Sequence, residues 1–174
     1  MKQLRWTTLN HFFVASLCAC LVSCSLGGPL REDQKATSYS LETSVPGWRE
    51  LKDKADADHA WLDEKSGAVM SVRSLCDRYE HVSIRNLSKN LQTVLMDVEI
   101  ISSKDRTIAS REAYDTLVKG QLDGVPVESR MVVVRKNNCI FDFNVTEHPA
   151  LSPSTKQAME RLLDSFDYKG DPSK

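Results

Sequence analysis

Apolar and polar residues alternate in the second half of this chain with the two-residue period of β-strands. The alternating runs cover residues 110–122, 125–136 and 139–146, and they are separated by Asp123-Gly124 and Asn137-Asn138. Both dipeptides accept a positive φ, which tight hairpin turns require. The pattern therefore predicts three consecutive strands of an antiparallel meander.

A second hairpin is predicted earlier in the chain. A strand around residues 59–63 and another over 68–76 flank the sequence Glu64-Lys65-Ser66-Gly67, whose residue types favour a turn. Cys76 falls on the apolar face of its strand, as Cys139 does in the last strand of the meander.

Two further stretches have the period of a helix. The first predicts a helix over residues 84–97 and has apolar residues at Ile84, Leu87, Leu91, Val94, Leu95 and Val98. The second closes the chain and has them at Ala158, Met159, Leu162, Leu163 and Phe166. Ser152 and Pro153 suit its start, and Ser154 with Gln157 could form a capping box. Strands in runs, with helices between and after them, predict an α+β fold with an antiparallel sheet flanked by helices.

The N-terminus has the pattern of an export signal. Lys2 and Arg5 precede an apolar run from Phe12 to Val22 that is too short to span a bilayer, and the run ends at Ser23-Cys24. Leu21 to Cys24 resembles the lipobox of bacterial lipoproteins, in which the cysteine is lipidated and the chain is cleaved just before it. The resemblance implies a lipid on Cys24, and the alternative is an ordinary secretory signal that contains cysteines.

This signal sets the predicted organisation of the chain. Residues 1–23 form the signal peptide, 24–38 a flexible tether rich in small and polar residues, 39–170 one α+β domain, and 171–174 a disordered tail. In lipoproteins of this kind, a serine such as Ser25 after the cysteine implies passage to the outer membrane of a two-membrane bacterium. We therefore expect a lipid-anchored envelope protein on the periplasmic face of that membrane.

Five cysteines are present, and the signal accounts for three of them. Cys18 and Cys20 leave with the signal peptide, and Cys24 carries the lipid. Cys76 and Cys139 remain in an oxidising compartment, where a lone pair is most simply interpreted as a disulfide. Two buried free thiols are the alternative.

Few residues combine in a way that suggests chemistry. Carboxylates and an imidazole cluster at Asp56, Asp58 and His59, and again at Glu147-His148, but neither group matches a calcium loop or a helical zinc motif. A solvated strand end is the simpler interpretation of both, so no metal or cofactor is predicted. No nucleophile elbow and no phosphate-binding glycine loop is present, and we predict a non-enzyme.

Two tryptophans and the overall charge bear on partners. Trp48 and Trp61 are predicted to pack in the core or at its rim, and the alternative is an exposed aromatic contact for a partner. The formal net charge is −1, and no cluster of lysine and arginine appears. A nucleic-acid partner therefore has no support.

The order of these motifs resembles a known group of domains. The order begins with Gly47-Trp48 and the hairpin that ends at Cys76, and it continues through an amphipathic helix. The strand turn Leu122-Asp123-Gly124 then leads into Lys136 to Phe143 and a final helix that ends in Ser165-Phe166. This looks like the Mog1/PsbP-like fold, in particular like bacterial envelope lipoproteins without a settled function. The resemblance implies an antiparallel sheet flanked by helices over about residues 40–168. Characterised members act mainly by binding other proteins, but their contact residues do not match positions here.

Two hypotheses for function follow. The first is a non-catalytic, lipid-anchored accessory protein that binds another envelope protein through the sheet or its rim. The second is a lipoprotein that binds a small ligand or a divalent metal, between sheet and helix or near Asp56, Asp58 and His59. A hydrolase would need an active site that the sequence does not display.

Overall fold

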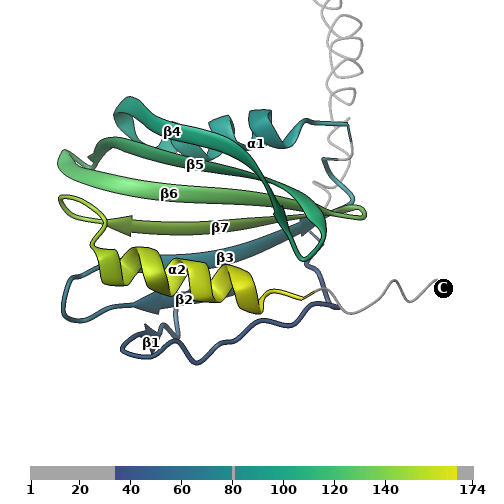
Figure 1. Ribbon diagram of the computed structural model, residues 1–174, viewed down its shortest axis with the longest axis horizontal. Coiled ribbons are helices and arrows are strands. Elements are labelled where there is room, and N and C mark those ends of the chain that lie inside the picture. Colours follow the sequence, from purple (N-terminus) through teal and green to yellow (C-terminus); the bar gives the residue numbers. More distant parts are fainter. Residues whose placement is uncertain (1–33, 80, 168–174) are drawn as a thin grey trace, which may run out of the picture. The chain divides into compact units, whose positions relative to one another are not determined.

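The computed structural model of the protein describes residues 34–79 and 81–167. These residues form a seven-stranded antiparallel sheet in the order β1-β2-β3-β7-β6-β5-β4 (Figure 1). The strands are β1 (Arg49–Glu50), β2 (His59–Leu62), β3 (Val69–Cys76), β4 (Met96–Ile108), β5 (Arg111–Leu122), β6 (Val125–Lys136) and β7 (Cys139–Glu147). The helices are α1 (Ile84–Leu91) and α2 (Pro153–Ser165), and a short 3-10 helix, η1 (Gln92–Val94), follows α1. The predicted α+β fold is confirmed.

Two-residue turns with positive φ values connect the central strands. Asp123 and Gly124, between β5 and β6, have φ values of 50° and 80°, and Ala109 and Ser110, between β4 and β5, have 48° and 61°. Two consecutive positive φ values match the natural twist of a two-residue hairpin. The predicted meander of β5, β6 and β7 is confirmed.

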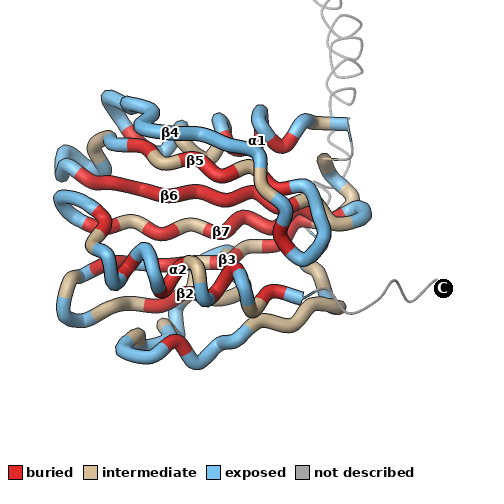
Figure 2. Tube along the Cα trace, in the orientation of Figure 1, coloured by how far each residue is buried: buried red, intermediate tan, exposed pale blue. Residues whose placement is uncertain are grey.

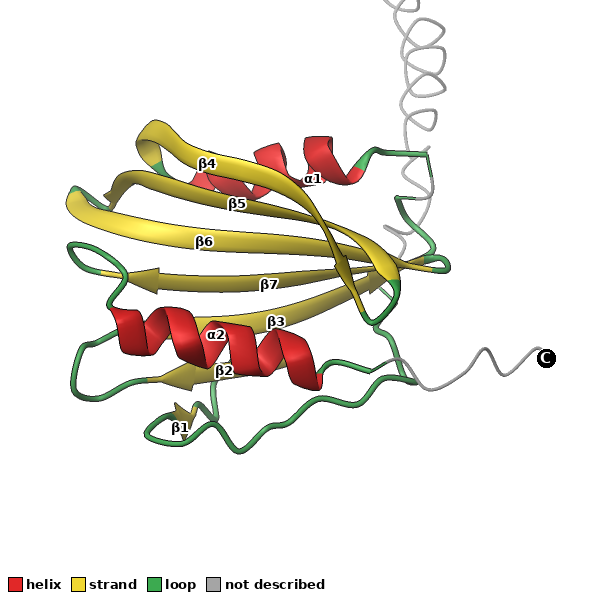
Figure 3. Cartoon of the chain, viewed as in Figure 1, coloured by secondary structure: helices red, strands yellow, loops and turns green. Residues whose placement is uncertain are grey.

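The two helices cover opposite faces of the sheet (Figure 3). Val133 of β6 packs with Ile84 and Leu87 of α1. Its neighbours Val132 and Val134 belong to the core beneath α2. Successive strand residues point to opposite faces, so β6 contributes to a core on each side of the sheet.

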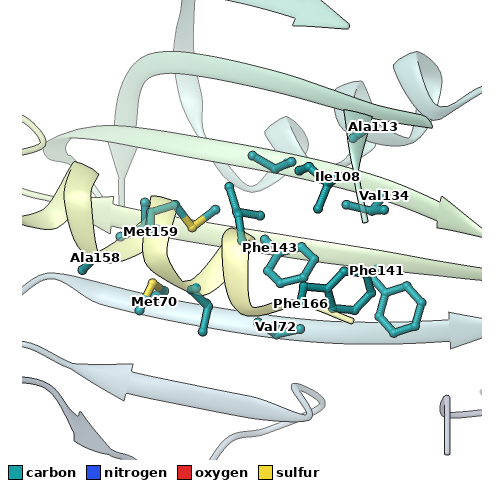
Figure 4. Packing of buried hydrophobic residues seen from close by; sticks show 14 of the residues in the cluster. Met70, Val72, Ile108, Ala113, Val134, Phe141, Phe143, Ala158, Met159 and Phe166 are labelled. Carbon is teal, nitrogen blue, oxygen red and sulfur yellow. The ribbon is translucent and has the colours of Figure 1, made fainter. Parts of the chain in front are cut away.

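The larger core lies beneath α2 (Figure 4). The Phe166 ring, just after α2, lies 4.9 Å from the Phe141 ring and 5.2 Å from the Phe143 ring, measured between centroids. Trp61 and Met159 are fully buried in the same cluster. Full burial of such a side chain stabilises the fold by about 1.5–3 kcal/mol. The α2 face therefore supplies most of the apolar stabilisation.

A disulfide between Cys76 and Cys139 joins β3 to β7. The two cysteines are directly opposed in the strand register, with their Cα atoms 4.0 Å apart. The bridge confirms the disulfide predicted from the pair of exported cysteines.

The predicted helix over residues 84–97 is wrong in its second half. α1 ends at Leu91, and residues 96–108 form β4, a strand that the sequence pattern does not predict; nor does it predict the two-residue strand β1. Asp97 has a φ of 52°, which a right-handed helix does not contain. Gly120 of β5 permits this path, because a Cβ at that position would lie 3.0 Å from the Met96 carbonyl oxygen.

Two smaller corrections concern a helix cap and the tether. Ser152 itself caps α2, since its Oγ accepts a hydrogen bond from the Thr155 amide at 3.2 Å, in place of the box predicted from Ser154. The segment 34–38, predicted as the end of the tether, is in contact with the domain: the Cys76 amide donates to the Gln34 carbonyl at 2.9 Å. The predicted signal peptide, Cys24 and the tail 171–174 lie outside the described residues.

Candidate functional site

The carboxylate of Asp58 is engaged by its own chain. Its Oδ2 accepts hydrogen bonds from the Ser74 amide at 2.8 Å and from the Tyr39 hydroxyl at 3.2 Å, and its Oδ1 lies 3.1 Å from Lys35 Nζ. Burial, followed by the charge and hydrogen bond of Asp58, raises the pKa of Tyr39. Asp58 therefore fastens residues 35–39 to the sheet, a structural role.

Asp56 and His59 are also paired, each with a different residue. Asp56 is exposed and lies 2.8 Å from an Arg73 guanidinium nitrogen, whereas His59 Nδ1 lies 3.3 Å from Glu50. Among residues 34–79 and 81–167, no group of three or more His, Cys, Asp or Glu side chains is placed to hold a metal ion. The structure does not bring Asp56, Asp58 and His59 together into a metal site.

The remaining sequence-predicted residues lie at the rim or in the core. Trp61 is fully buried and its indole N–H donates to the Thr43 carbonyl at 2.9 Å, so it packs in the core of the domain. Trp48 is half-buried against the same core. Glu147 is buried and accepts a hydrogen bond from the Ser152 amide at 2.8 Å, while His148 beside it is exposed.

A pocket of about 170 Å³ opens beside α1, on the face of the sheet away from α2. Its apolar lining residues are Leu75, Tyr79, Leu87, Leu91 and Ile140, but polar groups contribute more than half of the exposed lining. The polar lining residues are Arg73, Asn90 and Asp142. The pocket exists because α1 packs on β5 and β6 and leaves part of β7 and β3 uncovered.

Asp142 has an unusual environment for a carboxylate. It is 9 % exposed, and its Oδ1 is buried without a hydrogen-bond partner in the described part of the chain. Burial raises the pKa of Asp142 to about 6, although the charges of Arg73 and Lys35 oppose this shift. A buried carboxylate oxygen without a donor is costly and rare in folded proteins.

A second buried carboxylate, Asp115, accepts hydrogen bonds on both of its oxygens. Arg130 donates to it twice, at 3.0 and 2.7 Å, and Arg106 donates once, at 3.0 Å. Both arginines also bind Glu160 of α2, at 2.6 Å from Arg130 and 3.0 Å from Arg106. Burial by itself would raise the pKa of Asp115, but the two guanidinium groups outweigh it and lower that pKa. This closed network fastens α2 to β4, β5 and β6.

An exposed apolar surface, the β4 edge patch, lies at the opposite end of the sheet from β1. It consists of Val94, Met96, Val98, Ile100 and Ile101, with Leu122 and Val125 of the adjoining hairpin. Figure 2 shows β4 exposed along most of its length. β4 pairs with β5 alone, so its outer edge has no strand partner among the described residues. Exposed apolar groups in such numbers are typical of interaction sites.

Known proteins are similar to this chain in fold. No protein-family model matches the chain, and no curated protein is significantly similar to it. Among solved structures, the cyanobacterial PsbP protein CyanoP from Synechocystis matches with a TM-score of 0.52 and 12 % identity, over 76 % of this chain and 94 % of that chain. The domain has a Mog1/PsbP-like fold.

Two further solved structures are similar in fold to this chain. LpqN, described as involved in cell envelope biogenesis of Mycobacterium tuberculosis, matches with a TM-score of 0.52 and 13 % identity, over 80 % of this chain and 88 % of LpqN. A protein from Bacteroides thetaiotaomicron has a TM-score of 0.55 and 12 % identity over 76 % of this chain, which spans 46 % of that longer protein. At these identities the likeness shows the fold alone.

Proposed function

We propose that this protein is a lipid-anchored, non-catalytic binding module of the cell envelope that docks another envelope protein on the β4 edge patch. The exposed apolar side chains of β4, whose outer edge has no strand partner among the described residues, are the observation that carries the proposal. The lipobox ending in Cys24 supplies the anchor and the envelope location, on the periplasmic face of an outer membrane. The fold shared with LpqN, itself described as involved in cell envelope biogenesis, supports a role in the cell envelope.

The chemistry of the patch favours a protein partner that combines apolar and basic side chains. Asp97 and Glu99 lie between the exposed apolar residues of β4. If two copies paired through β4 with Val98 at the centre, Asp97 of each copy would face Glu99 of the other. Like charges directly opposite are destabilising. The same two carboxylates disfavour contact with an anionic lipid surface.

Site-specific photo-crosslinking in living cells tests the docking site. A photoreactive phenylalanine analogue is placed at Ile101, and the matched control is Val69 of β3, which is equally exposed at 43 % but lies outside the patch. We expect one envelope protein to crosslink from Ile101 and not from Val69. Glu99→Lys should reduce that crosslink severalfold, because it reverses a charge that the basic side chains of the partner would meet.

Three outcomes would contradict the docking proposal. Crosslinks from Ile101 to a second copy would indicate self-association, and crosslinks to lipid would indicate a membrane contact. Equal capture from Ile101 and Val69 would show that the patch has no specific partner.

The anchor is tested separately. Cys24→Ser removes the thiol that the lipid would occupy, so the variant should move from the membrane pellet to the soluble fraction. A variant that still sediments with membranes would show that the anchor proposal is wrong, whatever the crosslinking shows.

A further inference from the structure

The pocket beside α1 is lined by apolar side chains, by Arg73 and Asn90, and by a single buried carboxylate, that of Asp142. Asp142 of β7 is 9 % exposed, and this exposed remainder lines the pocket. Oδ1 is the buried oxygen, for which the described chain supplies no hydrogen bond, so a donor that enters the pocket reaches the carboxylate from its exposed side.

The carboxylate of Asp142, unpartnered at Oδ1 in the described chain, points to a donor as the missing partner, although the nearby charges of Arg73 and Lys35 are themselves positive. Arg73 of β3 is the cross-strand neighbour of Asp142, and its guanidinium lies 2.8 Å from Asp56 at the surface. Asp142 is the one carboxylate among the residues that line the pocket. Divalent cations require several oxygen ligands, which this lining does not provide. A monovalent ammonium group needs one carboxylate and gains a charge-assisted hydrogen bond from it.

We propose that this pocket binds a small molecule with a primary ammonium group on a short apolar stem. The ammonium donates to the carboxylate of Asp142. The stem lies against Leu75, Leu87, Leu91 and Ile140, whose side chains line the wall. A volume of about 170 Å³ suits a stem of a few carbon atoms beyond the ammonium group.

The environment of Asp142 makes this binding depend on pH. With a pKa of about 6 in the empty pocket, Asp142 is ionised at pH 7.5 and mostly protonated at pH 5. Arg73 of β3 and Lys35 of the N-terminal segment are the charged groups that act on it, and both oppose the effect of burial. Because only the ionised form attracts an ammonium group, affinity should fall about tenfold from pH 7.5 to pH 5.

The experiment uses n-butylamine as the probe and the full chain purified in detergent. Methyl NMR spectra report on Leu87, Leu91 and Ile140 in the pocket and on Leu162 in the opposite core. We expect saturable shifts of the pocket methyl groups with butylammonium and little change at Leu162. n-Butanol and n-butyrate test the neutral and the anionic group on the same stem, and both should bind at least tenfold more weakly.

Asp142→Asn is the decisive variant, and Asp164→Asn is its matched control on the exposed side of α2. Asp142→Asn should weaken butylammonium binding at least tenfold and remove its pH dependence, while Asp164→Asn leaves both unchanged. The proposal is overturned if butylamine gives no saturable shifts, if Asp142→Asn binds as well as the unaltered protein, or if n-butanol or n-butyrate binds equally well. These results leave the crosslinking test of the β4 edge patch unaffected.

Discussion

Each face of the sheet buries an aspartate, but the two aspartates differ in their hydrogen-bond partners and in the direction in which their pKa values move. Asp115, on the α2 face, is 4 % exposed and receives hydrogen bonds from two arginines, which lower its pKa. Asp142, on the α1 face, is 9 % exposed and has an oxygen without a donor, and burial raises its pKa to about 6. Both side chains are buried, and the partners that the neighbouring elements provide decide whether the ionised carboxylate is stabilised or destabilised.

The difference has a structural origin in the two helices. α2 extends over thirteen residues and carries Glu160 to the arginines of β4 and β6. α1 extends over eight residues, packs on β5 and β6, and stops short of covering Asp142. The longer helix, α2, supplies a partner for the buried charges on its face of the sheet, whereas the shorter helix, α1, leaves a pocket beside Asp142. The α2 face thus serves stability, and the α1 face is available for binding.

The largest effect is expected from breaking the satisfied network. Arg130→Ala removes the guanidinium that donates twice to Asp115 and leaves a buried charge with one remaining partner, Arg106. Removing one partner of a buried ion pair costs about 3–5 kcal/mol. Urea unfolding at pH 7.5 should show this loss in the free energy of unfolding.

Arg111→Ala is the control for that variant, because Arg111 is exposed at the start of β5. It should change the free energy of unfolding by less than about 0.5 kcal/mol. If Arg130→Ala and Arg111→Ala lower the free energy of unfolding by the same small amount, the network does not stabilise the fold. Asp115 would then not differ from Asp142 in its effect on stability.

In contrast to Arg130→Ala, Asp142→Asn is expected to raise the free energy of unfolding. The pKa of Asp142 is about 6 in the folded state, above the usual 3.8. Ionisation of Asp142 therefore destabilises the folded state, and the free energy of unfolding falls as the pH rises from about 4 through 6. A pKa of about 6 in place of 3.8 corresponds to about 3 kcal/mol above pH 7. Asp142→Asn removes this cost, and the variant should be more stable by about 1–3 kcal/mol at pH 7.5.

The pH profile distinguishes this explanation from a general packing effect. At pH 4 the gain from Asp142→Asn should shrink to below about 1 kcal/mol, because Asp142 is then protonated in the folded state. Asp164→Asn, on the exposed side of α2, should show no such change with pH. A gain that is equal at both pH values would contradict the raised pKa of Asp142.

The sequence predicts the buried elements of the sheet and α2 better than it predicts the exposed strand β4. The meander and α2 are predictable, because burial imposes a clear period on their apolar residues. β4 is not, because it is exposed on both faces up to Lys104 and no burial selects a two-residue period there. The apolar residues Val94, Leu95 and Val98, just before and within the start of β4, continue the spacing of α1 by chance and suggest a longer helix.

The candidate site was hidden for a similar reason. Asp142 alternates with Phe141 and Phe143, which predicts a solvent-facing side chain. Its burial depends on where α1 ends and on which strands α1 covers, and both are tertiary properties. Conversely, Asp56 and Asp58 cluster in sequence, yet their partners Lys35 and Arg73 come from other segments and engage them separately.

The smallest effect concerns the caps of the two helices. Ser83 Oγ accepts from the Asn86 amide at 3.3 Å at the start of α1, as Ser152 does from Thr155 in α2. Replacing such a cap by alanine costs about 1 kcal/mol. α2 buries Met159 and Leu162 in the main core, so Ser152→Ala should lower the global free energy of unfolding by that amount.

Ser83→Ala should act locally instead. α1 has eight residues and borders the open pocket, so it can open without unfolding the sheet. Amide hydrogen exchange in α1 should then accelerate about fivefold, the factor that corresponds to about 1 kcal/mol, while the urea midpoint moves little. Equal losses of global stability from Ser83→Ala and Ser152→Ala would show that α1 is as firmly coupled to the fold as α2. The pocket beside it would then be a rigid feature of the domain, one that a ligand enters without displacing the helix.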